Sequence, residues 1–258
     1  MNTRFFRVKC LTNLHMGGGD VNYSVIDLEV ERDPVLGEPT MNASGVKGAI
    51  RDFCEARAGK DSEQVKFIFG SRGSGGQPGS YSFFSGDLLA RPVRISGGEG
   101  AYVLATTPEL IGHFVEKATA LGVTGLDQSP LPAPRAGNVL CGRGCVEVEG
   151  LPATKSETPC TLLEQLLGTD NWALMTTDDL FAIDLPVQVH NLLADGDSKN
   201  LWYTQVVPHE SVFGLLISGP DGDAQLEELL GAEPIVQFGG GASTGNGYAR
   251  LEQVVGHE

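Results

Sequence analysis

Three carboxylates stand at alternate positions within residues 24–32: Asp27, Glu29 and Glu31. In an extended segment, side chains two residues apart share one face and lie about 7 Å from each other. Carboxylates at that spacing can position a divalent cation or a water molecule, as phosphodiester cleavage requires. Taken alone, the pattern is more often the solvated face of an edge strand.

The apolar residues of the same segment predict how it is oriented. Ile26, Leu28 and Val30 alternate with the acidic residues, so they should face the core while Asp27 points away from it. A glycine-rich turn, His15 to Asp20, precedes the segment and adds a histidine. Because a single histidine is more often structural than catalytic, this residue alone does not decide the chemistry.

A second candidate is the helix start Ser44-Gly45-Val46-Lys47-Gly48. Apolar residues recur at helical spacing over 44–57, Ser44 suits the N-cap and Gly59 suits the end. Backbone N–H groups at a helix start attract anions, and Lys47 with Arg51 would add positive charge one turn apart. The alternative is an ordinary capped amphipathic helix whose basic residues face water.

A third candidate is the glycine-rich loop 239–247, GGGASTGNG. It matches neither the G-x-x-x-x-G-K-[ST] nor the G-x-G-x-x-G order, and it precedes a strand instead of opening a helix. A metabolic nucleotide site is therefore disfavoured. Gly240, Gly241 and Gly245 would allow positive φ and a close approach of phosphate to the backbone. The alternative is a flexible turn.

Segments of strand and helix periodicity are mixed along the chain, which predicts an α+β fold, and 258 residues suit a single domain, 1–258, with insertions. Residues 122–157 are rich in Gly and Pro and are expected to form an irregular insertion, and 187–206 are expected to form a β-hairpin. The remaining expected strands are 4–11, 24–32, 81–95, 101–106, 212–217, 234–238 and 248–255, and the remaining expected helices are 108–121, 159–167 and 223–230.

The net charge of -15 argues against a nucleic-acid partner, because basic residues supply most phosphate contacts. The charge is uneven, however. Residues 1–100 hold 12 of the 18 basic and 12 of the 33 acidic residues, so all of the excess negative charge lies in residues 101–258. A basic groove in the first hundred residues can therefore coexist with an acidic surface elsewhere.

The five cysteines form no C-x-x-C pair and are odd in number. Reduced thiols are expected, and a zinc site is not. No stretch approaches 18 consecutive apolar residues, so we expect a cytoplasmic protein without a membrane partner.

The order of the three candidates resembles the signature of RAMP-superfamily backbone subunits of type III CRISPR complexes. Within Leu14 to Arg51, a His-Gly turn, an aspartate-bearing segment ending in Arg-Asp and the helix SGVKGAIR follow one another. Residues 90–108 and 201–213 resemble the Cmr (III-B) type more than the Csm type, and 238–251 resemble the glycine-rich loop that both share. The resemblance covers most of the chain.

What the resemblance implies is a ferredoxin-like (RRM-like) core with a thumb, here the hairpin 187–206, and copies of the chain stacked along guide RNA (crRNA). The implied activity is metal-dependent endonuclease cleavage of guide-paired target RNA inside a ribonucleoprotein with other CRISPR subunits. The family's catalytic aspartate falls on Asp27, which is also a possible ligand of Mg²⁺ or Mn²⁺. The implied RNA-binding residues are His15, Ser44, Gly45, Lys47, Arg51, Gly240, Gly241, Thr244, Gly245 and Asn246.

Two residues depart from the family pattern, since Ser24 and Glu29 stand where Gly and Pro are usual. The loop that presents Asp27 is therefore expected to differ in shape. Rival functions stay open: a catalytically silent backbone subunit, the Csm (III-A) equivalent, or a guide-processing ribonuclease of the same superfamily. Asp27 is the one sequence feature that separates the cleaving from the silent subunit.

Overall fold

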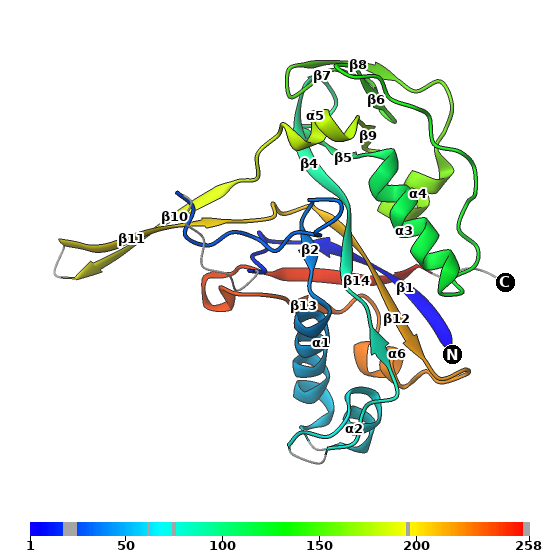
Figure 1. Cartoon of the computed structure of the whole chain (residues 1–258), viewed down its shortest axis with the longest axis vertical. Helices are drawn as coiled ribbons and strands as arrows, with labels where there is room; N and C mark the ends of the chain where they lie inside the picture. Colours follow the sequence, from blue (N-terminus) through cyan, green and yellow to red (C-terminus); the bar gives the residue numbers. More distant parts are fainter. Residues whose placement is uncertain (18–24, 61, 74–75, 195–196, 255–258) are drawn as a thin grey trace.

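The structure is a computed structural model that describes residues 1–17, 25–60, 62–73, 76–194 and 197–254 (Figure 1). The helices of this part are α1 (Ala43–Ala58), α2 (Glu63–Phe69), α3 (Pro108–Ala120), α4 (Thr161–Leu167), α5 (Thr177–Phe181), α6 (Gln225–Leu230) and the 3-10 helix η1 (Ala242–Thr244). The strands are β1 (Asn2–Cys10), β2 (Thr40–Met41), β3 (Ser82–Phe83), β4 (Gly86–Gly98), β5 (Tyr102–Thr106), β6 (Val139–Cys141), β7 (Cys145–Val148), β8 (Leu151–Lys155), β9 (Trp172–Leu174), β10 (Val187–Ala194), β11 (Asp197–Gln205), β12 (Val212–Gly219), β13 (Ile235–Gln237) and β14 (Tyr248–Val254). This mixed content bears out the α+β expectation.

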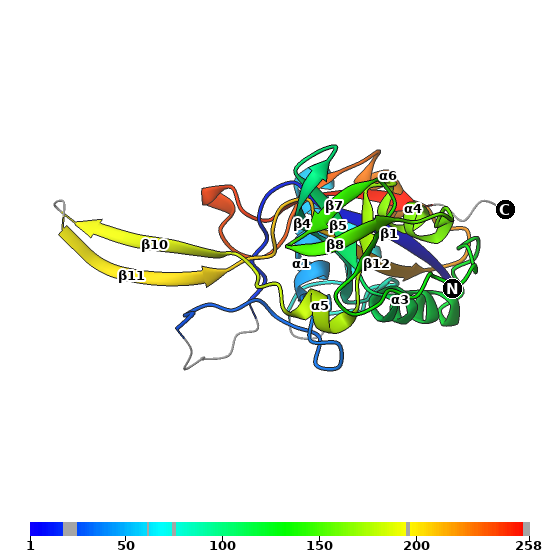
Figure 2. The ribbon, with the colours of Figure 1, turned by 90° about the horizontal axis from the view of Figure 1, so that it is seen from above.

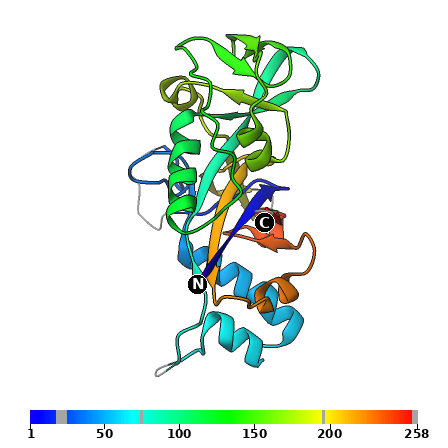
Figure 3. The same cartoon turned by 90° about the vertical axis from the view of Figure 1, so that its right-hand side faces the viewer.

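One half of the large sheet is antiparallel, with the strand order β13-β14-β1-β12-β4. Helix α1 lies between β1 and β4 in the sequence, and α6 lies between β12 and β14. Together with α2, both helices pack on one face of these strands, as Figures 1 and 3 show. Strand β1 is central, since Phe6 and Val8 enter this core while Phe5 enters the core of the opposite face.

The other half closes on itself. From β4 the order continues β5-β9-β6-β8-β7, and β7 pairs back with β4, so these six strands form a strand ring. Helices α3 and α4 pack beside it over a second core cluster, which includes Phe114 and Leu163. A third cluster, with Val93, Val139 and Leu180, joins the strands of the ring to α5. Strand β4 therefore belongs to both halves.

The expected hairpin forms from β10 and β11 and projects away from the rest of the molecule in two perpendicular views (Figures 1 and 2). Its register runs from Val187 opposite Gln205 at the base to Ala194 opposite Asp197. Apolar side chains along it are unusually exposed: Val189 is 60% and Leu192 is 56% exposed. The expected turn residues Asp195 and Gly196 lie outside the described residues.

Two predicted helices are confirmed, with one change of cap. Thr107 caps α3 through its side chain, which accepts from the Leu110 N–H, as Pro108 in the first turn indicated. Helix α1 ends at Gly59, as expected, but its N-cap is Asn42 and not Ser44. The Asn42 carboxamide oxygen accepts from the Ser44 N–H at 2.9 Å, so Ser44 lies inside the helix.

Two local expectations are wrong. Residues 122–157 are not irregular throughout, because β6, β7 and β8 form there as part of the strand ring. The described part of 24–32 is not a continuous strand, since it makes only isolated bridges, to Gly17, Thr204 and Pro39. Its alternation fails as well, since Leu28 is 47% exposed and only Val30 is fully buried among its apolar residues.

No helix in the described part of the chain is long and apolar enough to cross a membrane.

Candidate functional site

The turn that carries His15 lies where four segments meet. The His15 ring nitrogen Nδ1 is 2.8 Å from the Gln205 carbonyl oxygen at the base of the hairpin. The His15 carbonyl accepts from the Gly240 N–H at 2.9 Å, which ties the turn to the glycine-rich loop. On the other side, the Glu31 N–H donates to the Met16 carbonyl at 2.7 Å. The turn therefore joins the hairpin, the loop and the Asp27 segment.

Asp27 is held at the base of the hairpin by the main chain. Its carboxylate oxygen Oδ2 accepts from the Tyr203 N–H at 2.8 Å, and the side chain is exposed. The next residue, Leu28, donates to the Tyr203 carbonyl and accepts from the Gln205 N–H. Because three bonds from consecutive residues fix the segment on β11, the Asp27 carboxylate has a defined position without being buried.

The start of α1 reaches the same place. A Cβ atom on Gly45 would come within 2.8 Å of the Met16 methyl group, so this glycine lets the helix approach the His15 turn. The cap residue Asn42 also donates from its Nδ2 to a Glu31 carboxylate oxygen at 3.0 Å. Glu31 therefore has a structural partner, whereas Ser44 and Gly45 are exposed beside the turn.

The glycine-rich loop folds around η1 and is largely exposed. Gly241 and Gly245 take φ values of +78° and +80°, as predicted, but Gly240 does not have a positive φ. The Gly241 carbonyl accepts from the Thr244 and Asn246 N–H groups, which closes the loop tightly. The loop is therefore closed by its own backbone hydrogen bonds.

Two glycines that the sequence did not single out hold the loop in place. A Cβ on Gly239 would lie 2.1 Å from the His15 carbonyl oxygen, and a Cβ on Gly247 would lie 2.0 Å from the Phe238 carbonyl oxygen. Both residues also have positive φ values, +70° and +83°. Only glycine fits at either position, and the run of glycines in the sequence was the available signal.

The basic pair of α1 is not aimed at this site as a pair. Arg51 Nε lies 2.7 Å from a Glu55 carboxylate oxygen, and its side chain is 14% exposed. Lys47 Nζ lies 6.0 Å from the centre of the Phe83 ring, which belongs to β3. Arg51 therefore fits the capped-helix alternative, whereas Lys47 remains a candidate RNA contact.

We name the assembled region the hairpin-base site: His15, Met16, Asp27, Tyr203, Gln205 and loop 239–247. Within the described residues, no group of three or more His, Cys, Asp and Glu side chains could hold a metal ion. Glu29 lies in the Asp27 segment, and Ser24 lies outside the described residues. The described part of this chain does not by itself assemble the ligand set expected around Asp27.

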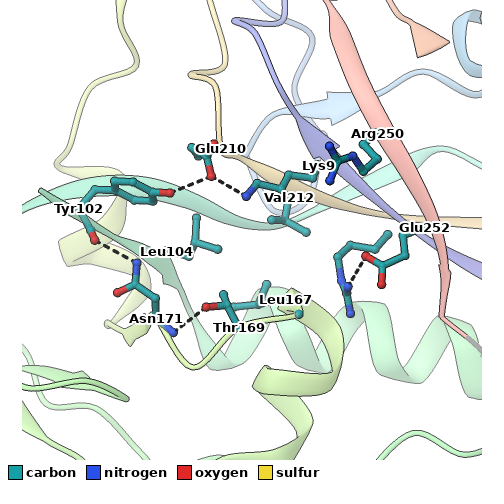
Figure 4. A pocket seen from close by; sticks show the side chains of 12 residues that line it. Lys9, Tyr102, Leu104, Leu167, Thr169, Asn171, Glu210, Val212, Arg250 and Glu252 are labelled. Carbon is teal, nitrogen blue, oxygen red and sulfur yellow. Dashed lines mark hydrogen bonds and ion pairs between the residues drawn. The ribbon is translucent and has the colours of Figure 1, made fainter. Parts of the chain in front are cut away.

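A separate cavity of about 240 Å³ opens between β1, β5, β12 and the end of α4 (Figure 4). Its charged groups are largely paired: Lys9 Nζ lies 2.7 Å from a Glu210 oxygen, and Arg7 lies 2.7 Å from Glu252. Burial would raise the pKa of Glu210, but hydrogen bonds from Lys9 and Tyr102 outweigh it and hold that pKa below its usual value. The pairing indicates a structural role for these charges.

Comparison with known proteins agrees with this arrangement. The model of the RAMP superfamily matches residues 7–250. The CRISPR system CMR subunit Cmr4 of Saccharolobus solfataricus is 34% identical over 109 residues, which is 41% of this chain and 35% of that protein. The match thus spans about a third of that relative's length.

Solved structures share the fold over nearly the whole chain. A type III-B Cmr-beta structure in the apo state superposes with a TM-score of 0.80 at 18% identity, covering 98% of both chains. Oligomeric Cmr4 from Pyrococcus furiosus superposes with a TM-score of 0.72 at 19% identity, covering 99% of both. Since the superfamily model matches most of the sequence, this chain belongs to the RAMP superfamily.

Proposed function

We propose that this chain is a guide-RNA-binding backbone subunit of a type III-B CRISPR ribonucleoprotein and that it cleaves guide-paired target RNA through Asp27. Its partners would be crRNA, target RNA, further copies of itself and other subunits of the complex, acting in the cytoplasm. Among the similar structures are an oligomeric Cmr4 and a Cmr-beta complex bound to cognate target RNA. The observation that carries the proposal is the position of Asp27 on the base of the hairpin.

The strand order supports a ferredoxin-like (RRM-like) core within the superfamily fold. Strands β14-β1-β12-β4 are antiparallel, α1 connects the β1 side to β4, and α6 connects β12 to β14. This βαββαβ arrangement places both helices on one face, and the hairpin emerges before β12. The other five strands of the ring, β5 to β9, would be an insertion into that core.

The hairpin has the surface of an element that inserts into a nucleic acid. Val189 and Leu201 are 60% and 49% exposed, and the rings of His190 and Trp202 stack at 5.2 Å. Apolar side chains can separate stacked bases, and aromatic rings can stack on the bases they expose. A hairpin that displaces one base pair would leave the adjacent phosphodiester near its base, where Asp27 lies.

The chemistry then needs few groups from the protein. Base pairing with the guide selects the target, so this chain has to bind backbone and shape only. The Tyr203 N–H fixes one oxygen of the Asp27 carboxylate, and the exposed carboxylate is free to orient or deprotonate a ribose 2′-hydroxyl. That hydroxyl would attack the adjacent phosphorus, and the bond to the 5′-oxygen of the next nucleotide would break.

A divalent metal ion, Mg²⁺ or Mn²⁺, belongs to the proposal as the group that would stabilise negative charge on the phosphate. The described residues do not assemble a set of three ligands, and Asp27 is the candidate ligand that this chain offers among them. EDTA added to the cleavage assay tests this requirement separately from the role of Asp27.

The decisive experiment uses assembled complexes and a labelled target RNA. Asp27→Ala should lower the cleavage rate by about 100-fold or more while guide and target binding persist. Asp27→Asn is the matched control for structure, since its carboxamide oxygen can still accept from the Tyr203 N–H but cannot take a proton. If Asp27→Ala cuts at the wild-type rate, the silent backbone subunit is the better assignment; if Asp27→Asn alone does so, Asp27 orients the hydroxyl without deprotonating it.

A further inference from the structure

Two of the five cysteines lie in direct contact. Cys141 Sγ in β6 is 2.7 Å from Cys145 Sγ at the start of β7. A disulfide bond is about 2.05 Å long, so the sulfur atoms need to approach by less than about 1 Å to bond. All five cysteines are free thiols in the structure, and the remaining three are buried. Three residues separate the pair, so it is not a C-x-x-C motif.

The strand ring fixes the backbone on both sides of this contact. Cys141 pairs with Ala173 of β9 and with Lys155 of β8, and its carbonyl accepts from the Ser156 N–H at 2.8 Å. Cys145 stands opposite Gly98 of β4. A Cβ at Gly98 would lie 2.7 Å from the Gly144 carbonyl oxygen, so the glycine allows the start of β7 to lie close. Neither thiol can easily move away from the other.

The short loop between the cysteines is anchored as well. The Gly142 N–H donates to the Trp172 carbonyl at 2.9 Å, and a Cβ on Gly142 would lie 2.3 Å from the Asp170 carbonyl oxygen. Arg143 forms an ion pair with Asp170 at 2.6 Å. The contact between the sulfur atoms therefore follows from several independent restraints and not from a loose loop.

We propose that Cys141 and Cys145 form a reversible redox modification site, a vicinal dithiol that a small-molecule disulfide such as oxidised glutathione converts into an intramolecular disulfide. The site is independent of RNA binding and of Asp27. Its product would link β6 directly to β7 across the strand ring.

The reaction proceeds by two thiol–disulfide exchanges. Cys145, the more exposed thiol, loses its proton to solvent and attacks one sulfur of the small disulfide. That S–S bond breaks, one thiolate leaves, and a mixed disulfide forms on Cys145. Cys141 then attacks Cys145 Sγ and gives its proton to the departing sulfur, which leaves as the second small thiol. Two protein thiols are oxidised, and one small disulfide is reduced to two thiols.

Burial determines which cysteine reacts first. It raises the pKa of the Cys141 thiol, and the neighbouring Cys145 thiol raises that pKa further. Cys141 is therefore a poor nucleophile toward a reagent in solution, but it needs no access to solvent to attack a sulfur that it already touches. Cys10, Cys54 and Cys160 are also free thiols and are buried, so they serve as internal references within the same chain.

The test measures disulfide formation in the full-length chain. Folded protein is incubated with oxidised glutathione, quenched in acid, alkylated and mapped by peptide mass spectrometry. We expect a single Cys141–Cys145 disulfide, three remaining free thiols and full reversal by dithiothreitol. The folded chain should form this link at least about 10-fold faster than the chain unfolded in urea, because the fold holds the two thiols together.

Matched variants keep the result interpretable. Cys160→Ser should form the link as the wild type does, whereas Cys145→Ser should form none. If Cys145→Ser does not fold, the wild type still tests the proposal through the ratio of its disulfide-formation rates in the folded and the unfolded chain. Five free thiols after oxidation, a glutathione adduct that persists on Cys145, or equal rates in folded and unfolded chain would overturn the proposal.

Discussion

The hairpin-base site and the strand ring hold their key side chains in opposite ways. At the hairpin-base site, Asp27 is exposed, and its position comes from main-chain bonds to Tyr203 and from the segment that follows it. In the strand ring, Val139 and Ala173 are completely buried together with Leu180 of the adjoining helix α5, and their positions come from packing. Side-chain changes should therefore cost function at the first region and stability at the second.

The largest expected loss of stability lies where α5 packs against the strand ring. Leu180→Ala should lower the free energy of unfolding by about 2–5 kcal/mol, because it leaves a cavity in a packed cluster. Cleavage and RNA binding per folded complex should stay unchanged. Urea unfolding of Leu180→Ala beside Phe181→Ala, whose side chain is 44% exposed, gives a matched pair of neighbours. A similar loss in both variants would contradict the packing argument.

The next effect separates two glycines of the same loop. Gly239→Ala forces a Cβ against the His15 carbonyl and should cost at least about 2 kcal/mol and weaken guide binding, because the His15 turn must move. Gly245→Ala meets no atom within 4 Å and should cost about 1 kcal/mol, from its positive φ alone. Urea unfolding measures the stability of both variants, and guide-RNA titration measures their affinity for the guide. Wild-type guide affinity in Gly239→Ala would show that the His15 turn does not contact RNA.

A smaller effect divides the basic pair of α1. Lys47→Ala should reduce the slope of log affinity against log salt by about 1 if Lys47 contacts a phosphate. Arg51→Ala should leave that slope unchanged, because Arg51 is engaged with Glu55, whose side chain is only 4% exposed. Arg51→Ala should instead reduce stability. A reduced slope in the Arg51 variant would place that residue on RNA after all.

The smallest effect concerns pH and the cavity beside β1. The lowered pKa of Glu210 means that its contribution to stability is complete above about pH 4.3, the ordinary glutamate value, and is lost as pH falls through the folded-state pKa. Glu210→Gln should therefore be less stable than the wild type by under about 1 kcal/mol at neutral pH. The difference should shrink as pH falls below about 4.3, as urea unfolding at a series of pH values can establish.

Local signals predicted the elements whose positions depend on nearby residues. Helix α3 follows from Thr107 and Pro108, the end of α1 follows from Gly59, and the hairpin follows from two apolar runs around a turn. For α1, the sequence predicts Ser44 as the N-cap, two residues after the actual cap Asn42, because both residue types are good caps. A contact with Glu31 favours Asn42.

Features that depend on distant segments were missed. The Asp27 segment is not a strand because its partners are Met16 and the base of β11, far away in the sequence, so alternation predicted the wrong face for Leu28. Strands β6 to β8 are three to five residues long and gain their pairing from β4 and β9. The approach of Cys141 to Cys145 depends on that same pairing.

Strand β4 has a consequence for how the molecule loses its structure. Its first half pairs with β12, and its second half pairs with β5 and β7, so removing β4 would take the edge strand from the antiparallel half and open the strand ring. The two halves are joined through this shared strand. We therefore expect unfolding in one cooperative transition, with coincident signals from the two tryptophans, Trp172 in β9 of the ring and Trp202 in β11 of the hairpin. A chain cut within β4 should not give two fragments that fold independently.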